Sequence, residues 1–130
     1  MSDRVKADIL IVDRDPKTRA DYRSWLEDEG YKVDDETDNG KFAFRLCNRK
    51  DYRLVITAIS IEDWDGIDYI ISNSLIDPKQ KILVIDYLTE ENIDALVQEP
   101  TVVGWLQKSA TRGEPITKEE FLRSVKAALQ

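Results

Sequence analysis

The stretch ADILIV at positions 7–12, followed by DRDP at positions 13–16, decides the fold class. An unbroken run of isoleucine, leucine and valine indicates a strand that is buried on both faces. Behind the proline, residues return at helical spacing on one face: Thr18, Tyr22, Trp25 and Leu26. Gly30 supplies a left-handed stop. The segment therefore predicts a strand over Ala7–Val12 that is followed by a helix of about four turns.

The chain repeats this strand-and-helix unit in type, though not in sequence. Apolar runs predict four further strands, at Tyr31–Asp35, Leu54–Ile59, Ile82–Ile85 and Val102–Leu106. The helices between them are predicted by amphipathic stretches, and Asn39-Gly40 and Thr89 open two of these. Thr117 and Glu120 have the spacing of a capping box, which makes the last helix the best signalled. Five strands alternating with five helices favour an α/β fold with a parallel sheet covered on both faces.

Composition limits the classes of function. The length of 130 residues predicts a single domain, residues 1–130, and the net charge of -7 predicts an acidic surface that repels nucleic acid. The absence of histidine and the single Cys47 exclude zinc sites, Ser-His or Cys-His catalysis and an internal disulfide. No apolar run approaches the roughly 20 residues that span a bilayer, and no secretory signal is recognisable. We therefore expect a cytoplasmic protein with no membrane contact.

In a parallel sheet of this kind, the functional crevice lies at the carboxyl ends of the strands. The residues at those ends are Asp13–Asp15, Thr57–Ser60, Asp86-Tyr87 and Lys108-Ser109.

At these positions the chain resembles the receiver domain of bacterial response regulators, and the resemblance covers essentially the whole sequence. The matching pieces are ILIVDRDP at 9–16, LVITA at 54–58, WDG at 64–66 and GWLQK at 104–108. The resemblance implies a flavodoxin-like (βα)5 doubly wound sheet with strand order 2-1-3-4-5. It also implies a site in which an aspartate after the third strand accepts a phosphoryl group from a histidine kinase. Two acidic residues after the first strand, a Thr or Ser after the fourth and a lysine after the fifth complete that site.

The chain keeps only part of this set. The acceptor position is Ala58, which has no nucleophile, and Arg14 replaces the second acidic residue that would hold magnesium. Asp86 replaces the Thr or Ser, whereas Asp13 and Lys108 are retained. Because a fixed cation stands where a carboxylate is needed, we expect no cofactor and weak or absent Mg²⁺ binding, with Asp13 as the residual candidate ligand.

The resemblance and these losses together predict a non-enzymatic pseudo-receiver that acts as a protein–protein interaction module in a two-component-type signalling pathway. Its expected partners are proteins, including a second copy bound through the fourth helix, fifth strand and fifth helix. Candidate residues on that surface are Glu90, Glu91, Asp94, Trp105, Arg112, Glu119, Arg123 and Lys126.

The alternative is a phosphorylation-dependent receiver whose acceptor was replaced at Ala58 by engineering or by a recent substitution. A single replacement would leave the rest of the site intact, yet Arg14, Asp86, Glu62 and Ser109 also depart from the family pattern. These departures favour natural degeneration. A replacement acceptor stays open as a further alternative, among Asp63, Ser60 and Thr57. Nucleotide or flavin binding has little support, because the DRDP turn lacks the glycines that bring backbone amides close to phosphate.

Two local questions follow. Arg14 and Lys108 are expected either to pair with Asp13 and Asp86 in a closed cluster, or to leave Arg14 in solvent with one aspartate on Lys108. Trp105 is either fixed inward or fixed outward as a contact residue, and the sequence favours core or partial burial. The Ser109–Pro115 segment, which is longer than in the family pattern, has no assigned purpose.

Overall fold

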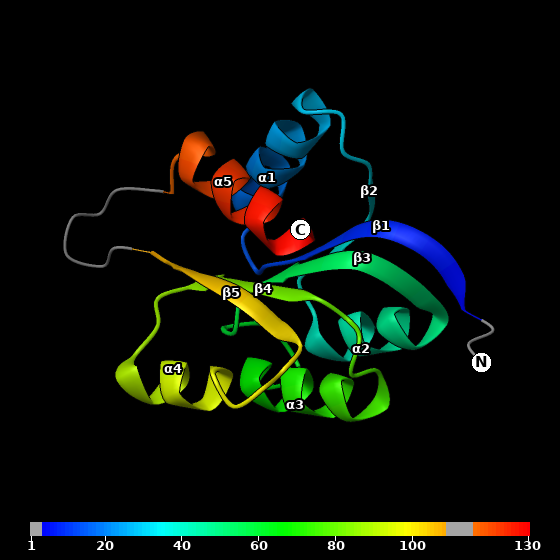
Figure 1. The fold of residues 1–130 in the computed structure, drawn as a ribbon, viewed down its shortest axis with the longest axis vertical. Helices are drawn as coiled ribbons and strands as arrows, with labels where there is room; N and C mark the ends of the chain where they lie inside the picture. Colours follow the sequence, from blue (N-terminus) through cyan, green and yellow to red (C-terminus); the bar gives the residue numbers. More distant parts are fainter. Residues whose placement is uncertain (1–3, 109–115) are drawn as a thin grey trace.

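The computed structural model describes residues 4–108 and 116–130, so the Ser109–Pro115 segment lies outside the described residues. The chain alternates strictly between strands and helices (Figure 1). The strands are β1 Val5–Val12, β2 Val33–Thr37, β3 Lys50–Thr57, β4 Ile82–Asp86 and β5 Val102–Gln107. The helices are α1 Pro16–Asp28, α2 Gly40–Arg49, α3 Gly66–Ile76, α4 Glu90–Leu96 and α5 Lys118–Leu129.

The five strands form one parallel sheet in the order β2-β1-β3-β4-β5, which confirms the predicted fold class. Helices α1 and α5 cover one face of the sheet, and α2, α3 and α4 cover the other (Figure 1). Each face buries its own apolar cluster, one centred on Phe121 and Leu54 and the other on Tyr69 and Val55. Alternate residues of one strand therefore supply both layers of the core.

Backbone pairing moves the strand ends away from the apolar runs. Strand β3 begins at Lys50 because Val5–Ala7 of β1 pairs with Lys50–Tyr52, although these segments are partly polar. The same strand ends at Thr57, so the predicted extension to Ile59 is wrong. The amide of Ala58 still donates to the Val12 carbonyl, at 2.9 Å, and the chain then leaves the sheet. The carboxyl end of β3 thereby becomes a loop whose amides are free for other partners.

The capping predictions are confirmed. Asn39 and Thr89 cap α2 and α4, and Thr117 with Glu120 forms the capping box of α5. Helix α1 is capped in the same way by Asp15. The Asp15 carboxylate accepts from the Lys17 amide and the Thr18 hydroxyl, and these hydrogen bonds lower its pKa. Gly30 adopts a positive φ of 85° after α1, as the stop requires. Local signals at the helix ends are therefore sufficient to set where most helices begin.

Two further features concern the helices and the single cysteine. In the described ranges 4–108 and 116–130, no helix is both long enough and apolar enough to cross a bilayer. Cys47 is buried in α2, and this burial raises the pKa of its thiol to about 12. At neutral pH the thiol is protonated and shielded from reagents.

Candidate functional site at the carboxyl edge of the sheet

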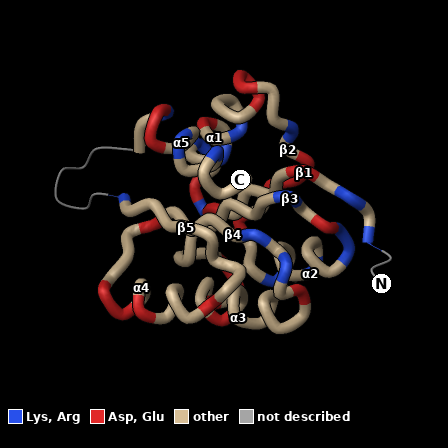
Figure 2. The backbone as a smooth tube through the Cα atoms, viewed as in Figure 1, with Lys and Arg blue, Asp and Glu red and all other residues tan. Residues whose placement is uncertain are grey.

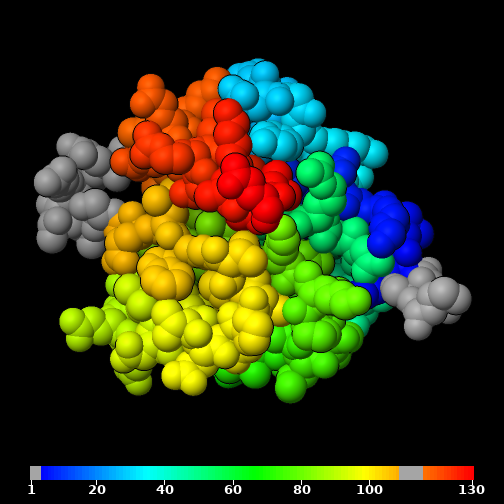
Figure 3. All heavy atoms as spheres, in the orientation of Figure 1, coloured from blue at the N-terminus to red at the C-terminus, as the bar shows by residue number. Residues whose placement is uncertain are grey.

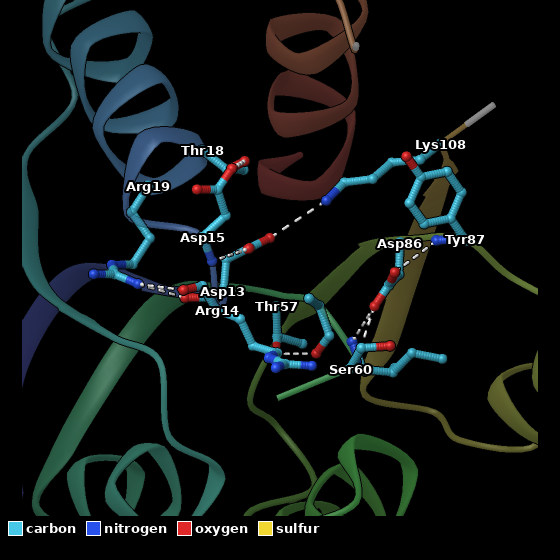
Figure 4. Close-up of polar contacts among 12 residues, drawn as sticks. Asp13, Arg14, Asp15, Thr18, Arg19, Thr57, Ser60, Asp86, Tyr87 and Lys108 are labelled. Carbon is cyan, nitrogen blue, oxygen red and sulfur yellow. Dashed lines mark hydrogen bonds and ion pairs between the residues drawn. The ribbon is translucent and has the colours of Figure 1, made fainter. Parts of the chain in front are cut away.

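The structure brings the predicted site residues to one edge of the sheet (Figure 4). Asp13 follows β1, Asp86 is the last residue of β4 and Lys108 follows β5. Ala58 lies just past β3 and is almost fully buried. The residues that follow parallel strands meet at one edge of the sheet. The positions at the end of each predicted strand therefore identified the site from the sequence.

Asp13 and Lys108 form a mostly buried ion pair. The Lys108 Nζ lies 3.5 Å from Asp13 Oδ2, and the two side chains are 20% and 7% exposed. The other oxygen, Oδ1, accepts from the Asp15 amide at 2.9 Å. Oδ2 is buried and accepts no hydrogen bond, so the ammonium is what compensates its charge. Lys108 also lies 5.9 Å from the centre of the Tyr87 ring.

Asp86 does not share this ion pair. Its Oδ2 accepts from the amides of Ile59 and Ser60, each at 2.9 Å, and its Oδ1 accepts from the Tyr87 amide at 2.7 Å (Figure 4). The residue is 5% exposed, so this carboxylate is held in the interior by backbone donors. Such charge-assisted bonds are stronger than bonds between neutral groups. Residue types alone could not reveal this, because every residue except proline has an amide.

Arg14 turns away from the other charges, so the closed four-charge cluster is wrong. Its guanidinium pairs with Glu62 at 3.2 Å, and the two side chains are 58% and 53% exposed. The loop after β3 is joined to the loop after β2, because Gly40 donates to the Glu62 carbonyl at 2.9 Å. This contact carries Glu62 beside Arg14. The structure therefore matches the simpler arrangement, in which one aspartate contacts Lys108.

Arg19 of α1 was not singled out by sequence reasoning, yet it fixes the turn that carries Asp13 and Arg14. Its guanidinium donates to the Asp13 carbonyl at 2.7 Å and pairs with Glu36 of β2 at 3.1 Å. No sequence pattern indicated this role, because Glu36 is far from Arg19 in the sequence.

Tyr22, also on α1, is buried close to the site. Burial, and next the Asp13 and Asp86 carboxylates, raise the pKa of its phenol, which stays protonated.

The three alternative acceptors, Thr57, Ser60 and Asp63, differ in their exposure to solvent. Thr57 is fully buried and its hydroxyl donates to the Ala58 carbonyl at 2.7 Å, whereas Ser60 is exposed and lines an open pocket of about 500 Å³. Asp63 is exposed, adopts a positive φ of 64° and accepts from the Asn39 side chain. Asp65, which directly precedes Gly66, caps α3. Of the three alternative acceptors, Ser60 and Asp63 are the ones that solvent can reach.

The side chains at this edge do not fit a magnesium ion. Within the ranges 4–108 and 116–130, no three His, Cys, Asp or Glu side chains are placed to hold a metal. The Asp13 carboxylate faces an ammonium, and Arg14 occupies the position of the second acidic residue. Because Mg²⁺ needs several oxygen ligands and tolerates cations poorly, this donor set disfavours it.

With the geometry established, comparison with known proteins decides the family. The model of the response regulator receiver domain family matches residues 9–117. The chain belongs to this family.

Solved receiver domains share the fold at low sequence identity. A CheY-like receiver domain protein of Methanospirillum hungatei JF-1 has a TM-score of 0.82 at 21% identity, covering 96% of this chain and 94% of that one. The chemotaxis protein CheY4 of Vibrio cholerae has a TM-score of 0.79 at 20% identity, covering 96% and 100%. These likenesses confirm the receiver fold.

Curated relatives match over part of their length. The virulence-factor transcription regulator BvgA of Bordetella pertussis is 37% identical over 62 residues, which are 48% of this chain and 30% of that protein. An uncharacterized 14.6 kDa protein from the sodA1 3′ region of Leptolyngbya boryana is 37% identical over 70 residues, 54% of this chain and 53% of that one. The matches therefore span from under a third to about half of these relatives.

Trp105 of this receiver domain keeps 40% of its surface exposed, which contradicts a core position. It lies in register beside Val84 of β4, whose side chain belongs to the apolar cluster on the face covered by α2, α3 and α4. Helix α5 packs closely on β5, whereas α4 contacts it much less. The sheet face on the α4 side of β5 is therefore left partly open, and Trp105 lies there.

Proposed function

We propose that this receiver domain is a pseudo-receiver, which binds a protein partner in a two-component-type pathway without being phosphorylated. The observation that carries the proposal is the chemistry of the strand ends. Ala58 offers no nucleophile, and the amides that follow it are already bound by the Asp86 carboxylate. The proposal gives the domain no catalytic role, no metal and a place in the cytoplasm.

The alternative keeps phosphorylation and treats Ala58 as a single engineered or recent replacement of the acceptor. Arg14 and Asp86 weigh against it. Each brings a charge of the wrong sign for its position, and each has its own partner in the folded domain. A site that had lost only its nucleophile would not have rebuilt these contacts.

Intact mass measurement after incubation with Mg²⁺ and a small phosphodonor tests the proposal. We expect the unmodified chain to show no mass gain, because Ala58 leaves the acceptor position without a carboxylate and Arg14 stands where a magnesium ligand is needed. Gain of one phosphoryl group would overturn the pseudo-receiver. The variants Ser60→Ala and Asp63→Asn would then identify which exposed group had taken it.

The proposed partner surface is the open side of β5, between α4 and α5 (Figure 3). Two exposed apolar side chains of β5 are assigned to it: Val103 is 42% exposed and Trp105 40%. The first turn of α4, where Figure 2 shows acidic positions, holds Glu90 and Glu91, which we assign to the charged rim of this surface. An aromatic centre with a charged rim has the composition of a protein interface.

Trp105→Arg tests this surface, with a second copy of the chain as the first partner to examine. We expect sedimentation equilibrium to show self-association about tenfold or more weaker in the variant, because a tryptophan at an interface centre carries much of the binding energy. Leu75→Arg on α3 is the matched control, since Leu75 is 82% exposed and lies away from β5. Equal weakening by both variants, or by neither, would exclude a homodimer through this surface.

A further inference from the structure

The loop after β3 and the start of the β4–α4 loop form a small anion site. Three backbone N–H groups, those of Ile59, Ser60 and Tyr87, converge on one carboxylate at 2.7 to 2.9 Å. Converging amides make a concave positive site that selects oxyanions. The carboxylate belongs to Asp86 of the same chain, so the site is filled from within.

A close contact fixes the direction of these amides. Gly66 at the start of α3 donates its own N–H to the Ile59 carbonyl at 3.1 Å. A Cβ atom on Gly66 would lie 2.3 Å from the Ile59 Cα, so the two backbones touch directly. The peptide groups after Ala58 are therefore held in place by α3, and the anion site is rigid.

The negative charge of Asp86 is compensated mainly by backbone amides, because the nearby cations pair with other carboxylates. Lys108, the nearby cation, pairs with Asp13, and Arg14 pairs with Glu62. Asp86 is 5% exposed, and an ion this deeply buried requires strong compensation. Three charge-assisted hydrogen bonds supply it.

Two of the three donors immediately follow residue 58 in the chain. An anionic group carried by a side chain at that position would meet the same amides, and Asp86 already occupies them. We infer that the Asp86 carboxylate is a built-in ligand that permanently supplies the negative charge that phosphorylation would bring to this site. This inference rests on the proposed function and deepens it, because it states how the domain is regulated: the loop after β3 is held in one liganded state without any input.

The inference also defines a ligand class. Removing the Asp86 side chain would leave three directed N–H groups with no acceptor, and a small oxyanion such as acetate or inorganic phosphate would fit them. Filling of the vacated site by a free anion would show that its donors are preformed. The unmodified chain would not take the anion there, because its own carboxylate competes at very high effective concentration.

The test is an NMR titration of Asp86→Ala with sodium acetate and then with inorganic phosphate, against sodium chloride at equal ionic strength. We expect the amide protons of Ile59, Ser60 and Tyr87 to move upfield in the variant, and either oxyanion to move them back. The unmodified chain and Asp94→Ala, which removes an exposed carboxylate on α4, should show neither change. Unchanged amide shifts in Asp86→Ala, or equal anion binding at these amides in the unmodified chain, would overturn the inference.

A second variant keeps the test decisive if Asp86→Ala does not fold. Asp86→Asn retains the shape but removes the charge, so the same three amide protons should move upfield by a smaller amount. Unmoved protons in this variant would also overturn the inference. Failure of the proposed function is recognised separately, because it is a mass gain in the unmodified chain and does not depend on these amide shifts.

Discussion

Gly66→Ala is expected to destabilise the domain by about 3 kcal/mol, at the upper end of the range for overpacked sites. The added methyl group would lie 2.3 Å from the Ile59 Cα and 2.5 Å from its carbonyl oxygen. Both are backbone atoms, so no side-chain rotation relieves the clash. The loop after β3 must move, and its amides are the ones that hold Asp86. The measurement is urea unfolding followed by tryptophan fluorescence.

Gly104→Ala on β5 is the matched control, because its added Cβ would meet only a Leu83 methyl group at 3.5 Å, an ordinary contact. We expect this variant to change the free energy of unfolding by less than about 1 kcal/mol. A loss in Gly66→Ala no larger than that of the control would mean that α3 does not press against the Ile59 backbone, and that the anion site is not rigid.

Lys108→Met is expected to cost about 2 kcal/mol of stability. The substitution keeps most of the aliphatic stem and removes the ammonium, which leaves the 7%-exposed Asp13 side chain without a cation at 3.5 Å. Removing one partner of a buried pair costs about 3–5 kcal/mol, and the 20% exposure of Lys108 reduces this figure. Chemical unfolding at neutral pH gives the number.

Asp13→Asn provides the comparison. Its amide oxygen still accepts from the Asp15 N–H, and Lys108 can reach solvent, so we expect a cost below about 1 kcal/mol. The double variant should regain most of the stability that Lys108→Met loses. If Lys108→Met were no more destabilising than Asp13→Asn, the charge of Asp13 would not depend on Lys108.

The fold was predictable because its signals are local. Apolar runs such as Ile9–Val12 located the buried strands, and capping residues such as Thr117 and Asn39 set where helices begin. Strand ends were less predictable where pairing is through the backbone alone. The polar start of β3 at Lys50 forms because β1 lies beside it, which no local pattern indicates.

The residues that form the site were predictable, but the hydrogen bonds and ion pairs among them were not. The strand-end rule and the family resemblance found Asp13, Ala58, Asp86 and Lys108. Charge counting left mutual pairing and a single Lys108–aspartate contact equally open, whereas in the structure Asp86 is held by peptide N–H groups that carry no formal charge. The partner of Arg14 depended on a contact between two loops distant in sequence. Interactions of this kind become visible only when the backbone is in place.

We propose that the site is closed to phosphorylation at several positions and not at Ala58 alone. The test restores the family residues at these positions and measures the intact mass of each variant after incubation with Mg²⁺ and a small phosphodonor. We expect Ala58→Asp to gain no phosphoryl group, because Asp86 already occupies the three amides and Arg14 places a cation where a magnesium ligand is needed. Ala58→Asp combined with Arg14→Asp and Asp86→Thr should gain one. Modification of the single Ala58→Asp variant would show instead that the chain has lost only its nucleophile, and would overturn the pseudo-receiver proposal.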